Sequence, residues 1–494
     1  MMTYLLGIDV GTSALKAALF TPDGRTVAQA SRGYPTRHPQ PGWAEQDPAD
    51  WWGAACAATR EALDAAGARP GEVACVGVDG QSWAAVAVDA QGEALLPTPI
   101  WTDTRAREEC AQMERLAGAE ALFACSGNPL GPGYTLPKIR WYQRHAPQAM
   151  ARAAAVLQSN GYIVRRLTGE CTQDASQGYG LACFDVRRGR WDLDLARALQ
   201  VPAQLLAPVR ACHEVVGRVT AQAAALTGLL AGTPVVAGGL DAACGALGAG
   251  VTEPGQTQEQ GGQAGGMSIC LDAPVADPRL ILSQHVAPGR WLLQGGTTGG
   301  GGALKWLREQ VCPELSFEQM SELAAGVPAG SGGVLFLPYM EGERSPLWNP
   351  DARGAFYGLR YGVGRAHLVR AVMEGVAFSL RHNLDVAAAA GARAGTLRAM
   401  GGAANSRVWT QIKADVTGRA IEVPGSDTAT ALGAAMLAGM GAGVYADAAE
   451  AARTVRVTRT HRPDAAACAA YEARYAAYLE LSQRLQPMMR ETKE

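Results

Sequence analysis

A chain of 494 residues is too long to fold around one hydrophobic core, so two large domains or three smaller ones are expected. The formal net charge of −2 and the lack of basic runs argue against nucleic acid and anionic membrane surfaces as partners. The sequence has no signal-like N-terminal segment and no run of about 18 uncharged apolar residues, so we expect a cytoplasmic protein without membrane contact.

The eleven cysteines are scattered and form no C-x-x-C pair, which predicts small buried thiols in a reducing compartment. Several common enzyme signatures are also missing, namely H-E-x-x-H, G-x-S-x-G, the Walker G-x-x-x-x-G-K-[ST] and G-x-G-x-x-G. A nucleotide would therefore have to be bound by another architecture.

The first predicted element is a β-hairpin with a polar tip. Apolar runs at 4–8 and 14–20 indicate two strands, and Gly11 permits a tight turn between them. The turn presents backbone N–H groups, and Thr12 and Ser13 add hydroxyl donors. This combination is typical of turns that bind phosphate.

Two charged residues belong to the same hairpin. Lys16 can place a positive charge over the same anion. A lone carboxylate, Asp9, would repel a phosphate, so its position makes sense if it faces Mg²⁺ through metal-bound water. The short pattern is equally compatible with an ordinary N-terminal hairpin.

Strand-like apolar runs then alternate with Ala-rich helical stretches, which is the pattern of α/β layers. We expect strands at 73–78 and 83–89 around a turn at 79–82. A buried strand at 233–241 runs into glycines and ends on the carboxylate of Asp241.

A glycine-dense stretch after Gly245 predicts the domain boundary, which divides the chain into 1–245 and 246–494. The segment 256–271 then predicts a second hairpin with a Gly-rich tip. Two phosphate hairpins, each opening a domain, indicate a duplicated fold that closes on a nucleotide between its halves. Two unrelated β-turns are the alternative.

Two glycine loops precede predicted helices in the second half. Residues 295–302 lead into a helix at 303–309, and 400–406 lead into a helix through Trp409 and Ile412. Bare amides and the positive end of a helix dipole make such a loop a seat for an anion or nucleotide. A flexible linker is the alternative for the first loop.

Further motifs complete a set that extends from about residue 5 to about residue 440. In chain order the motifs are 7–16, 42–48 with Trp51 and Trp52, 133–141, 235–241, 336–346, Gly401-Gly402 and 431–435. Together they resemble the FGGY carbohydrate kinases and, within that family, the members that phosphorylate xylulose. The resemblance implies an α/β fold of two actin-like or hexokinase-like (ribonuclease H-like) domains that flank a deep cleft, with ATP and Mg²⁺ in the cleft.

The resemblance also implies site residues, with Asp241 as the catalytic general base and Asp9 facing the metal. The residues expected along the ATP phosphates and around the nucleotide are Gly11, Thr12, Ser13, Lys16, Gly262, Gln263, Gly301, Gly302, Gly401, Gly402 and Asn405. The residues expected to contact the sugar are Gln81, Ser82, Trp83, Asp103 and Asp241. For Asp103 a buried ion pair is the alternative.

The chain departs from the family pattern in both halves. Residues 80–83 are Gly-Gln-Ser-Trp where Gly-Gln-Met-His is usual, and Ala242 stands where Asn often follows the catalytic carboxylate. These changes alter which hydroxyls are recognised, while Trp83 can stack on a sugar face. Residues 261–265 are Gly-Gly-Gln-Ala-Gly in place of Leu-Gly-Thr-Ser-Gly, so Gln263 offers an amide instead of a hydroxyl.

Two remaining features have structural interpretations. Glu343 and Arg344 are expected to form a structural pair beside the cleft. A C-terminal docking helix is predicted, which folds back onto another domain or onto the second subunit of a homodimer. Its apolar face consists of Tyr471, Tyr475, Tyr478, Leu481 and Leu485.

The expected function is that of an ATP-dependent sugar kinase, with conversion of D-xylulose to D-xylulose 5-phosphate as the leading reaction. One alternative is a kinase for another ketose, a polyol or an aldonate, of the ribulose, glycerol or gluconate type. Another is a catalytically weak, nucleotide-dependent sugar sensor. The presence of Asp241 and Asp9 favours the enzyme, whereas Gln263 favours the sensor.

Overall fold

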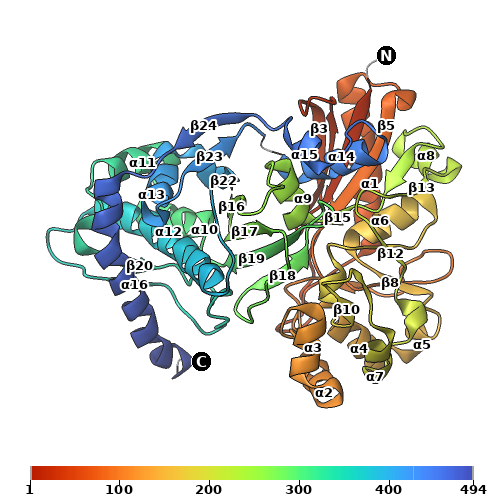
Figure 1. The fold of residues 1–494 in the computed structure, drawn as a ribbon, viewed down its shortest axis with the longest axis horizontal. Coiled ribbons are helices and arrows are strands. Elements are labelled where there is room, and N and C mark those ends of the chain that lie inside the picture. The colour runs from red at the N-terminus through yellow and green to blue at the C-terminus, as the bar shows by residue number, and fades with distance from the viewer. Residues whose placement is uncertain (1–2, 427, 492–494) are drawn as a thin grey trace.

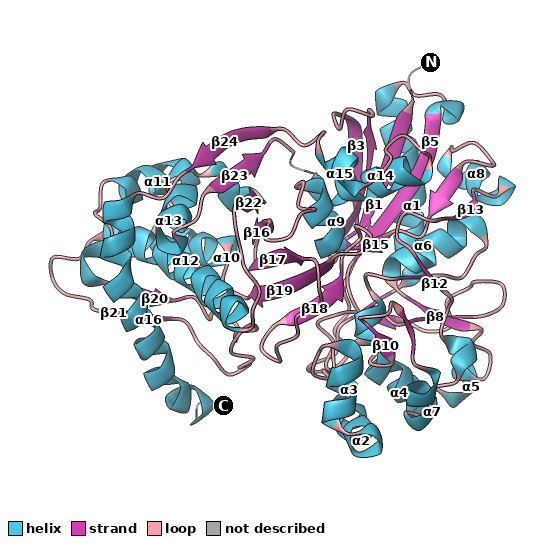
Figure 2. Ribbon diagram, viewed as in Figure 1, coloured by secondary structure: helices cyan, strands magenta, loops and turns pink. Residues whose placement is uncertain are grey.

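The computed structural model describes residues 3–426 and 428–491. These residues form two α/β lobes, each built on one large mixed sheet (Figure 1). Helices pack against each sheet (Figure 2). In this part of the chain we find no helix with the length and hydropathy needed to cross a membrane.

The first sheet is built from the N-terminal half of the chain. Its strands are β1 (Tyr4–Val10), β2 (Ala14–Phe20), β3 (Thr26–Gly33), β5 (Val73–Gly80), β13 (Val215–Arg218), β14 (Pro234–Val236) and β15 (Gly239–Leu240). They lie in the order β13-β14-β5-β1-β2-β3, and β15 also pairs with β5. Because β1 is antiparallel to β2, the predicted first hairpin is confirmed, and β5 extends it as a parallel neighbour.

The second sheet repeats this plan. Its strands are β16 (Thr257–Gly261), β17 (Gly265–Leu271), β18 (Ile281–Gln284), β19 (Trp291–Thr297), β22 (Leu397–Met400), β23 (Ile421–Pro424) and β24 (Val457–His461). Their order is β18-β19-β17-β16-β22-β23-β24. Because β16 is antiparallel to β17, the second predicted hairpin is confirmed. Like the first hairpin, it has a parallel neighbour, which here is β22.

Short strand pairs and 3₁₀ turns connect the larger elements. The pairs are β4 (Glu45–Gln46) with β7 (Thr98–Pro99), β6 (Val86–Val88) with β8 (Ala155–Leu157), β9 (Gln173–Asp174) with β12 (Val209–Arg210), β10 (Phe184–Asp185) with β11 (Arg190–Trp191), and β20 (Leu335–Leu337) with β21 (Ala355–Tyr357). The 3₁₀ turns are η1 (Pro70–Glu72), η2 (Gly178–Gly180), η3 (Ala203–Leu205), η4 (Ser331–Gly333) and η5 (Gly402–Asn405).

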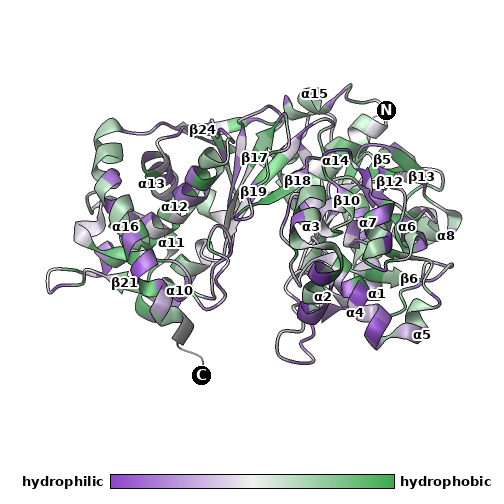
Figure 3. Ribbon diagram, turned by 60° about the horizontal axis from the view of Figure 1, so that its bottom comes forward, coloured by the Kyte–Doolittle hydropathy of each residue, from purple (hydrophilic) through white to green (hydrophobic). Residues whose placement is uncertain are grey.

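Helices of the N-terminal half surround the first sheet. They are α1 (Pro48–Ala66), α2 (Arg107–Ala117), α3 (Ala119–Ser126), α4 (Thr135–His145), α5 (Pro147–Met150), α6 (Ser159–Thr168), α7 (Leu193–Ala198), α8 (Ala221–Thr227) and α9 (Asp241–Gly248). α1 begins where Asp47 caps the amide of Ala49 and ends at Gly67, whose φ of 60° closes the helix. α2 lies at the periphery and is hydrophilic in Figure 3.

The C-terminal half contributes the remaining helices. They are α10 (Gly301–Val311), α11 (Phe317–Ala325), α12 (Arg365–Ala389), α13 (Arg407–Thr417), α14 (Ala429–Gly441), α15 (Ala448–Ala452) and α16 (Ala465–Glu491). In α16 the predicted face packs into the core of the second lobe, with Tyr471, Tyr475 and Tyr478 around Phe378 at centroid distances of 5.9, 5.9 and 5.4 Å. The helix therefore docks on its own half of the chain.

The alternation of side chains in β1 decides where its carboxylate lies. Ile8 and Val10 belong to the core between the sheet and helices α1 and α6. Leu5 and Gly7 take the opposite face, which α9 and α14 cover. Asp9 shares that second face because side chains two residues apart point the same way in a strand.

Helix α14 returns to the first sheet although it lies far beyond residue 245. A Cβ atom at Gly7 would overlap the carbonyl oxygen of Ala431, and one at Gly77 would overlap that of Ala434. Glycine in β1 and β5 therefore lets α14 approach the sheet closely, and Figure 1 shows α14 in blue beside the red N-terminal strands. Helix α14, which follows residue 245 in the chain, therefore packs against strands that precede it.

Two predicted elements differ from the structure. The strand expected at 233–241 is interrupted at Gly238, whose φ of 78° breaks the pairing, and α9 starts at Asp241. The turn expected at 79–82 is wrong for its first two residues, because Asp79 continues β5 through parallel pairing with β1. Only the end of the strand expected at 83–89 is formed, as β6.

Candidate active site

Asp241 is the first residue of α9 and follows β15 directly. Its Oδ1 accepts a hydrogen bond from the backbone N–H of Ala242 at 2.6 Å, and the helix N-terminus favours negative charge at this point. Burial, reinforced by the negative charge of Asp9, raises the pKa of Asp241 to about 7. A carboxylate with this pKa can accept a proton near neutral pH.

A further buried carboxylate, Asp79, lies beside Asp9 on the neighbouring strand. The parallel register of β1 and β5 pairs these two residues. Both carboxylate oxygens of Asp79 are buried without a hydrogen-bond partner of normal geometry in the described chain. Burial raises the pKa of Asp79 well above its ordinary value, and the charges of Asp9 and Asp241 add to that rise.

Asp79 is a site residue that the sequence analysis missed. A signal for it exists, because Gly-Ile-Asp at 7–9 recurs as Gly-Val-Asp at 77–79. The structure pairs the two triplets residue by residue. A repeated Gly-x-Asp in two strand-like runs could therefore have predicted adjacent carboxylates.

The first hairpin is held by contacts at Thr12. The indole N–H of Trp101 donates to the Thr12 hydroxyl at 3.0 Å, and the Gln46 amide donates to the Thr12 carbonyl at 2.6 Å. Lys16 pairs across the hairpin with Asp9. Burial raises the pKa of Asp9, and the positive charge of Lys16 opposes that rise.

The turn itself is closed by its own backbone. The N–H of Gly11 donates to the carbonyl of Ala14 at 3.2 Å, and the hydroxyl of Tyr34 donates to the carbonyl of Gly11. Ser13 is exposed at the tip. The structure therefore presents Ser13 to solvent while it fixes the position of Gly11.

A cavity of about 340 Å³ lies between the two hairpins and Asp241. Among the described residues, the charged side chains that line it are Asp241 and Arg344. The full lining is Thr12, Ser82, Trp83, Trp101, Tyr179, Leu240, Asp241, Ala242, Gln260, Gly262, Gln263, Ala264, Gly265, Gly266, Met267, Ser268, Ile281, Gln294, Gly295, Gly296 and Arg344. We call this space the reaction cavity.

Aromatic rings form one wall of the reaction cavity. Trp83 lies edge-on to Tyr134 and Tyr179, with centroids 4.4 and 5.9 Å away. Trp83 also has a φ of 59°, which a residue with a bulky side chain rarely adopts. The backbone at Trp83 is therefore strained, and this conformation holds the ring beside Ser82.

Lys138 holds the loops behind this wall. Its ammonium donates to the carbonyls of Trp83, Ile100 and Gly133 at 2.9, 2.8 and 2.6 Å. Burial lowers the pKa of Lys138 to about 7. The sequence analysis noted the motif that contains Lys138 but gave this residue no role, because the three carbonyls come from separate loops.

Two of the residues expected at the sugar lie outside the reaction cavity. Gln81 is buried behind the hairpin, where its amide donates to Gln46 at 2.9 Å. Asp103 is fully buried, and its carboxylate accepts from the guanidinium of Arg105 at 2.7 Å and from the N–H of Ala44 at 2.7 Å. The buried ion pair, left open as the alternative for Asp103, is the arrangement in the structure.

The expected pair of Glu343 and Arg344 is wrong. Oε1 of Glu343 accepts from the backbone N–H of Thr298 at 2.8 Å and from that of Arg344 at 2.7 Å. The Arg344 side chain forms no salt bridge in the described part of the chain and instead lines the reaction cavity. Oε1 of Glu343 is satisfied by backbone donors, whereas its Oε2 is buried without a hydrogen-bond partner, and the guanidinium of Arg344 faces the cleft.

A second, larger cavity of about 690 Å³ adjoins the second hairpin. It gathers residues that the sequence analysis assigned to the nucleotide. Its lining is Gly261, Gly262, Gln263, Gly301, Leu304, Lys305, Phe317, Glu318, Ser321, Glu322, Gly402, Ala403, Asn405, Ser406, Arg407, Val408 and Trp409. Gly401 borders this nucleotide cavity with a φ of 83°, packed against the carbonyl of Gly261.

The expectation of bare amides at the start of α10 is wrong for Gly301 and Gly302. Their N–H groups donate to the carbonyls of Gly262 and Gln263 at 2.7 and 3.0 Å. The tip of the second hairpin therefore docks onto the helix N-terminus. These amides fix the hairpin, which in turn faces both cavities.

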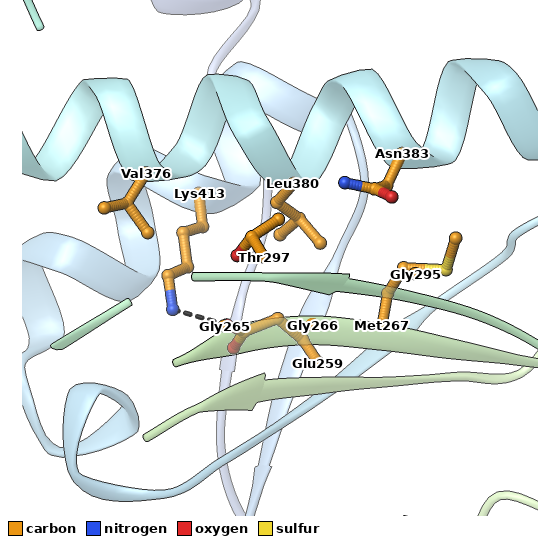
Figure 4. A pocket seen from close by; sticks show the side chains of 10 residues that line it. All are labelled: Glu259, Gly265, Gly266, Met267, Gly295, Thr297, Val376, Leu380, Asn383 and Lys413. Carbon is orange, nitrogen blue, oxygen red and sulfur yellow. Dashed lines mark hydrogen bonds and ion pairs between the residues drawn. The ribbon is translucent and has the colours of Figure 1, made fainter. Parts of the chain in front are cut away.

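Beneath the second hairpin lies a buried ion pair, seen in Figure 4. Nζ of Lys413, on α13, lies 2.5 Å from Oε1 of Glu259, on β16. The Lys413 ammonium also lies 5.1 Å from the ring of Trp409, which lines the nucleotide cavity. The ion pair therefore connects the hairpin strand to the helix beside that cavity.

Within residues 3–426 and 428–491, no group of three or more His, Cys, Asp or Glu is placed to hold a metal ion. Asp9 and Asp79 pair on neighbouring strands, and the charges of Asp9 and Asp241 both act on Asp79. A magnesium ion commonly takes only one or two protein carboxylates and completes its shell with phosphates and water. This donor set suits a metal carried by a nucleotide.

Two duplicated sheets, two cavities and a carboxylate at a helix N-terminus define a two-domain α/β phosphotransfer enzyme of the actin and hexokinase class. Residues 4–248 match the N-terminal domain of the FGGY family of carbohydrate kinases, and residues 270–442 match its C-terminal domain. The chain belongs to this family, whose members use ATP.

Relatives match over nearly their whole length. The xylulose kinase of Escherichia coli is 32% identical over 489 residues, covering 98% of this chain and 99% of that protein. The L-xylulose/3-keto-L-gulonate kinase of the same organism is 32% identical over 492 residues, with 98% of each chain covered. The crystal structure of xylulose kinase from Rhodospirillum rubrum superposes with a TM-score of 0.91 at 34% identity, covering 99% of this chain and 100% of that one.

Proposed function

We propose that this kinase transfers the γ-phosphoryl group of ATP to D-xylulose and yields D-xylulose 5-phosphate and ADP. The observation that carries the proposal is the position of Asp241, a buried carboxylate that faces an aromatic-walled cavity between two phosphate-type hairpins. Kinases of xylulose that align over nearly the whole chain support the choice of sugar.

In the proposed reaction, the substrate hydroxyl gives its proton to the carboxylate of Asp241. The freed oxygen forms a bond to the γ-phosphorus, and the bond from that phosphorus to the bridging oxygen of ADP breaks. The electron pair of the broken bond leaves with ADP. A base with a pKa of about 7 is suited to this task because about half of it is ionised at neutral pH and it still holds a proton well.

We assign the phosphates of ATP to the space between the hairpins. Thr12 and the second hairpin tip face the reaction cavity, and Lys16 brings a positive charge to the first hairpin. The residues assigned to the phosphates are Gly11, Thr12, Ser13, Lys16, Gly262 and Gln263. The nucleoside is assigned to the nucleotide cavity, beside Gly301, Gly302, Gly401, Gly402 and Asn405.

Asp9 is the residue that would hold Mg²⁺, with Asp79 beside it on β5. The position of Asp79 supports this assignment because its carboxyl group hydrogen-bonds to that of Asp9 and so places a second oxygen ligand next to the first. Bound Mg²⁺ would neutralise charge on the phosphates. Asp9 would orient the ion, and Lys16 would keep Asp9 ionised.

For the sugar we assign Ser82 and Trp83 to direct contact and Gln81 and Asp103 to the support of the pocket. Trp83 offers an apolar ring, and Ser82 offers a hydroxyl to a sugar hydroxyl. Gln81 supports the hairpin through Gln46, and Asp103 fixes the loop before α2 through Arg105.

The test is a panel of acceptors assayed by ADP release at saturating ATP and Mg²⁺. D-Xylulose, L-xylulose, D-ribulose, glycerol and gluconate cover the ketose, polyol and aldonate classes. We expect the highest kcat/KM for D-xylulose. A tenfold preference for another acceptor would contradict the sugar assignment, and the absence of acceptor-dependent ADP release would contradict the kinase assignment.

A further inference from the structure

Arg344 places a largely buried guanidinium in the reaction cavity without an anionic partner. The described residues provide it no salt bridge, and its hydrogen bond to the carbonyl of Thr297 is long, at 3.4 Å. Burial lowers the pKa of Arg344 and the negative charge of Glu343 opposes that fall, and a guanidinium stays charged at any physiological pH. Among the described contacts, one of its five N–H donors has a protein acceptor.

An arrangement of this kind is costly for folding. Removing a charge from water costs several kcal/mol unless a partner restores the lost interactions. Glu343 is adjacent in sequence, and its charge acts on Arg344, yet its Oε1 accepts from two backbone N–H groups and the two side chains form no salt bridge. Direct ion-pair contact with the guanidinium is therefore left to an anion that enters the cavity from outside the chain.

The residues around the guanidinium of Arg344 indicate which kind of anion it binds. A Cβ at Gly296 would lie 2.9 Å from Cζ of Arg344, so the guanidinium rests directly on β19 where that strand has no side chain. Gly296 pairs with Gly266, at the base of the second hairpin tip. On its other side Arg344 lies 5.5 Å from the ring of Trp101, whose N–H holds Thr12 of the first hairpin.

Arg344 thus lies between the two hairpins, in the same cavity as Asp241. A sugar kinase always brings one anion to this place, the phosphoryl group in transit. A carboxylate on the acceptor would be present only for acidic sugars. The second hairpin also lacks hydroxyl donors at its tip, where Gln263 and Ala264 stand. A cation beside this tip can therefore stabilise phosphoryl charge that the hairpin leaves without hydroxyl donors.

We propose that Arg344 is a catalytic residue that binds the equatorial oxygens of the γ-phosphoryl group as it passes from ATP to the acceptor. The inference rests on the proposed function for the existence of that transfer and is independent of which sugar accepts the group. As the acceptor oxygen bonds to phosphorus and the bond to ADP breaks, Arg344 stabilises the charge on the transferred group. Asp241 takes the hydroxyl proton, and ADP leaves with the electron pair.

The central variant is Arg344→Met, which keeps an unbranched, flexible side chain of shorter reach and removes the charge. We expect kcat to fall about 10²–10³-fold, the typical effect of one lost donor to a transition-state anion, with KM for ATP and acceptor within about threefold. Arg344→Lys should recover part of the loss because the charge remains without the planar fork. Arg353→Met is the matched control, since Arg353 is exposed on the same loop and its recorded hydrogen bonds go to carbonyls.

Binding gives a readout that does not depend on turnover. ADP with Mg²⁺ and aluminium fluoride mimics the group in transit, so wild type with acceptor should bind it more tightly than ADP alone. In Arg344→Met the ratio of the two affinities should fall at least about tenfold, while the affinity for ADP alone is kept. Equal preference in variant and wild type would overturn the proposal.

Stability separates this role from a structural one. Because Arg344 has no protein partner, Arg344→Met should leave the thermal unfolding midpoint unchanged or raise it. A lower midpoint together with wild-type kcat would overturn the proposal. A loss confined to acceptors that carry a carboxylate would also overturn it, and it would identify an acid-binding site instead.

The failure of this inference and the failure of the proposed function have different signatures. If wild type phosphorylates no acceptor of the panel, the proposed function fails, and the aluminium fluoride titration without acceptor still tests Arg344. If wild type is active and Arg344→Met is equally active, only the role of Arg344 fails.

Discussion

The two hairpins share one topology and carry different chemistry. Their last cross-strand pairs are Val10 with Leu15 and Gly261 with Gly265. Counting back one residue from these pairs places Gln260 of the second hairpin where the first has Asp9. The first hairpin combines a carboxylate and a lysine, whereas the second offers an amide and backbone.

The same duplication extends through the sheets. The order β3-β2-β1-β5-β14-β13 in the first lobe corresponds to β19-β17-β16-β22-β23-β24 in the second. In both, the hairpin is antiparallel and the next strand is parallel. The comparison teaches that one framework supports two tasks, with the carboxylates assigned to the base and the metal in the first half and the guanidinium of Arg344 in the second.

The layer beneath each hairpin differs as well. Ile8 packs into an apolar core, whereas its counterpart Glu259 forms a buried ion pair with Lys413. Replacement of such a pair by apolar residues is often neutral, so the pair does not imply greater stability. The ion pair, drawn in Figure 4, instead links the second hairpin to α13, whose Trp409 lines the nucleotide cavity.

The largest effect is expected at Asp241, the residue of the first half that we assign as the base. Asp241→Asn should lower kcat about 10³–10⁴-fold because the variant cannot accept the hydroxyl proton. ADP affinity should stay within about threefold, since the nucleotide cavity lies in the other half. Steady-state kinetics and calorimetric titration measure both, with exposed Asp272→Asn as the control. Turnover within tenfold of wild type would refute the assignment.

Removal of one ion-pair partner tests the layer beneath the second hairpin. Lys413→Met should lower the free energy of unfolding by about 3–5 kcal/mol because it leaves Glu259 buried and unpaired. The double variant Glu259→Leu, Lys413→Met should recover most of that loss. Urea unfolding measures both, and Lys305→Met, at a half-exposed lysine, should change stability by less than about 0.5 kcal/mol. If Lys413→Met is as stable as wild type, the ion pair does not contribute to the stability of the fold.

The asymmetry of the hairpin tips predicts unequal effects on ATP use. Thr12→Val should lower kcat/KM for ATP about 10- to 100-fold, the range for a hydrogen bond to a charged group. Gln263→Ala should lower it less than about fivefold, because the long amide is less well positioned. Thr12→Ser keeps the hydroxyl and serves as the control. An equal or larger loss at Gln263 would reverse the comparison.

The pH dependence should follow the base in the first half. Asp241 acts in its ionised form, so kcat/KM for the sugar should be constant above pH 7. Below that value it should fall about tenfold per pH unit as the carboxylate is protonated. Initial rates between pH 5.5 and 8.5 at saturating ATP and Mg²⁺ provide the measurement. A flat profile down to pH 5.5 would exclude Asp241 as the titrating base.

Much of the fold could be predicted from local sequence. The two hairpins follow from apolar runs around glycine turns, and the tyrosines of α16 follow from helical spacing. The place of Asp241 at the end of a buried strand could be predicted locally, whereas its role as a base is what the family resemblance implies. Each of these signals lies within one short segment, where periodicity and turn chemistry are sufficient.

The errors concern contacts between distant segments. Asp79 was placed in a turn because only its pairing with β1 extends the strand. The amides of Gly301 and Gly302 were expected to be bare because their acceptors lie about 40 residues earlier in the chain. Arg344 was paired with its neighbour, but the Glu343 carboxylate finds its donors on the backbone.

The most direct test of a phosphotransferase with its base in the first half is ³¹P NMR of a reaction with D-xylulose, ATP and Mg²⁺. Our account predicts one phosphate monoester on the C5 hydroxyl of the sugar for each ADP formed, and no detectable amount of either product with Asp241→Asn over the same time. Inorganic phosphate with no sugar phosphate, or ATP left intact while D-xylulose binds, would contradict it and would favour a nucleotide-dependent sensor.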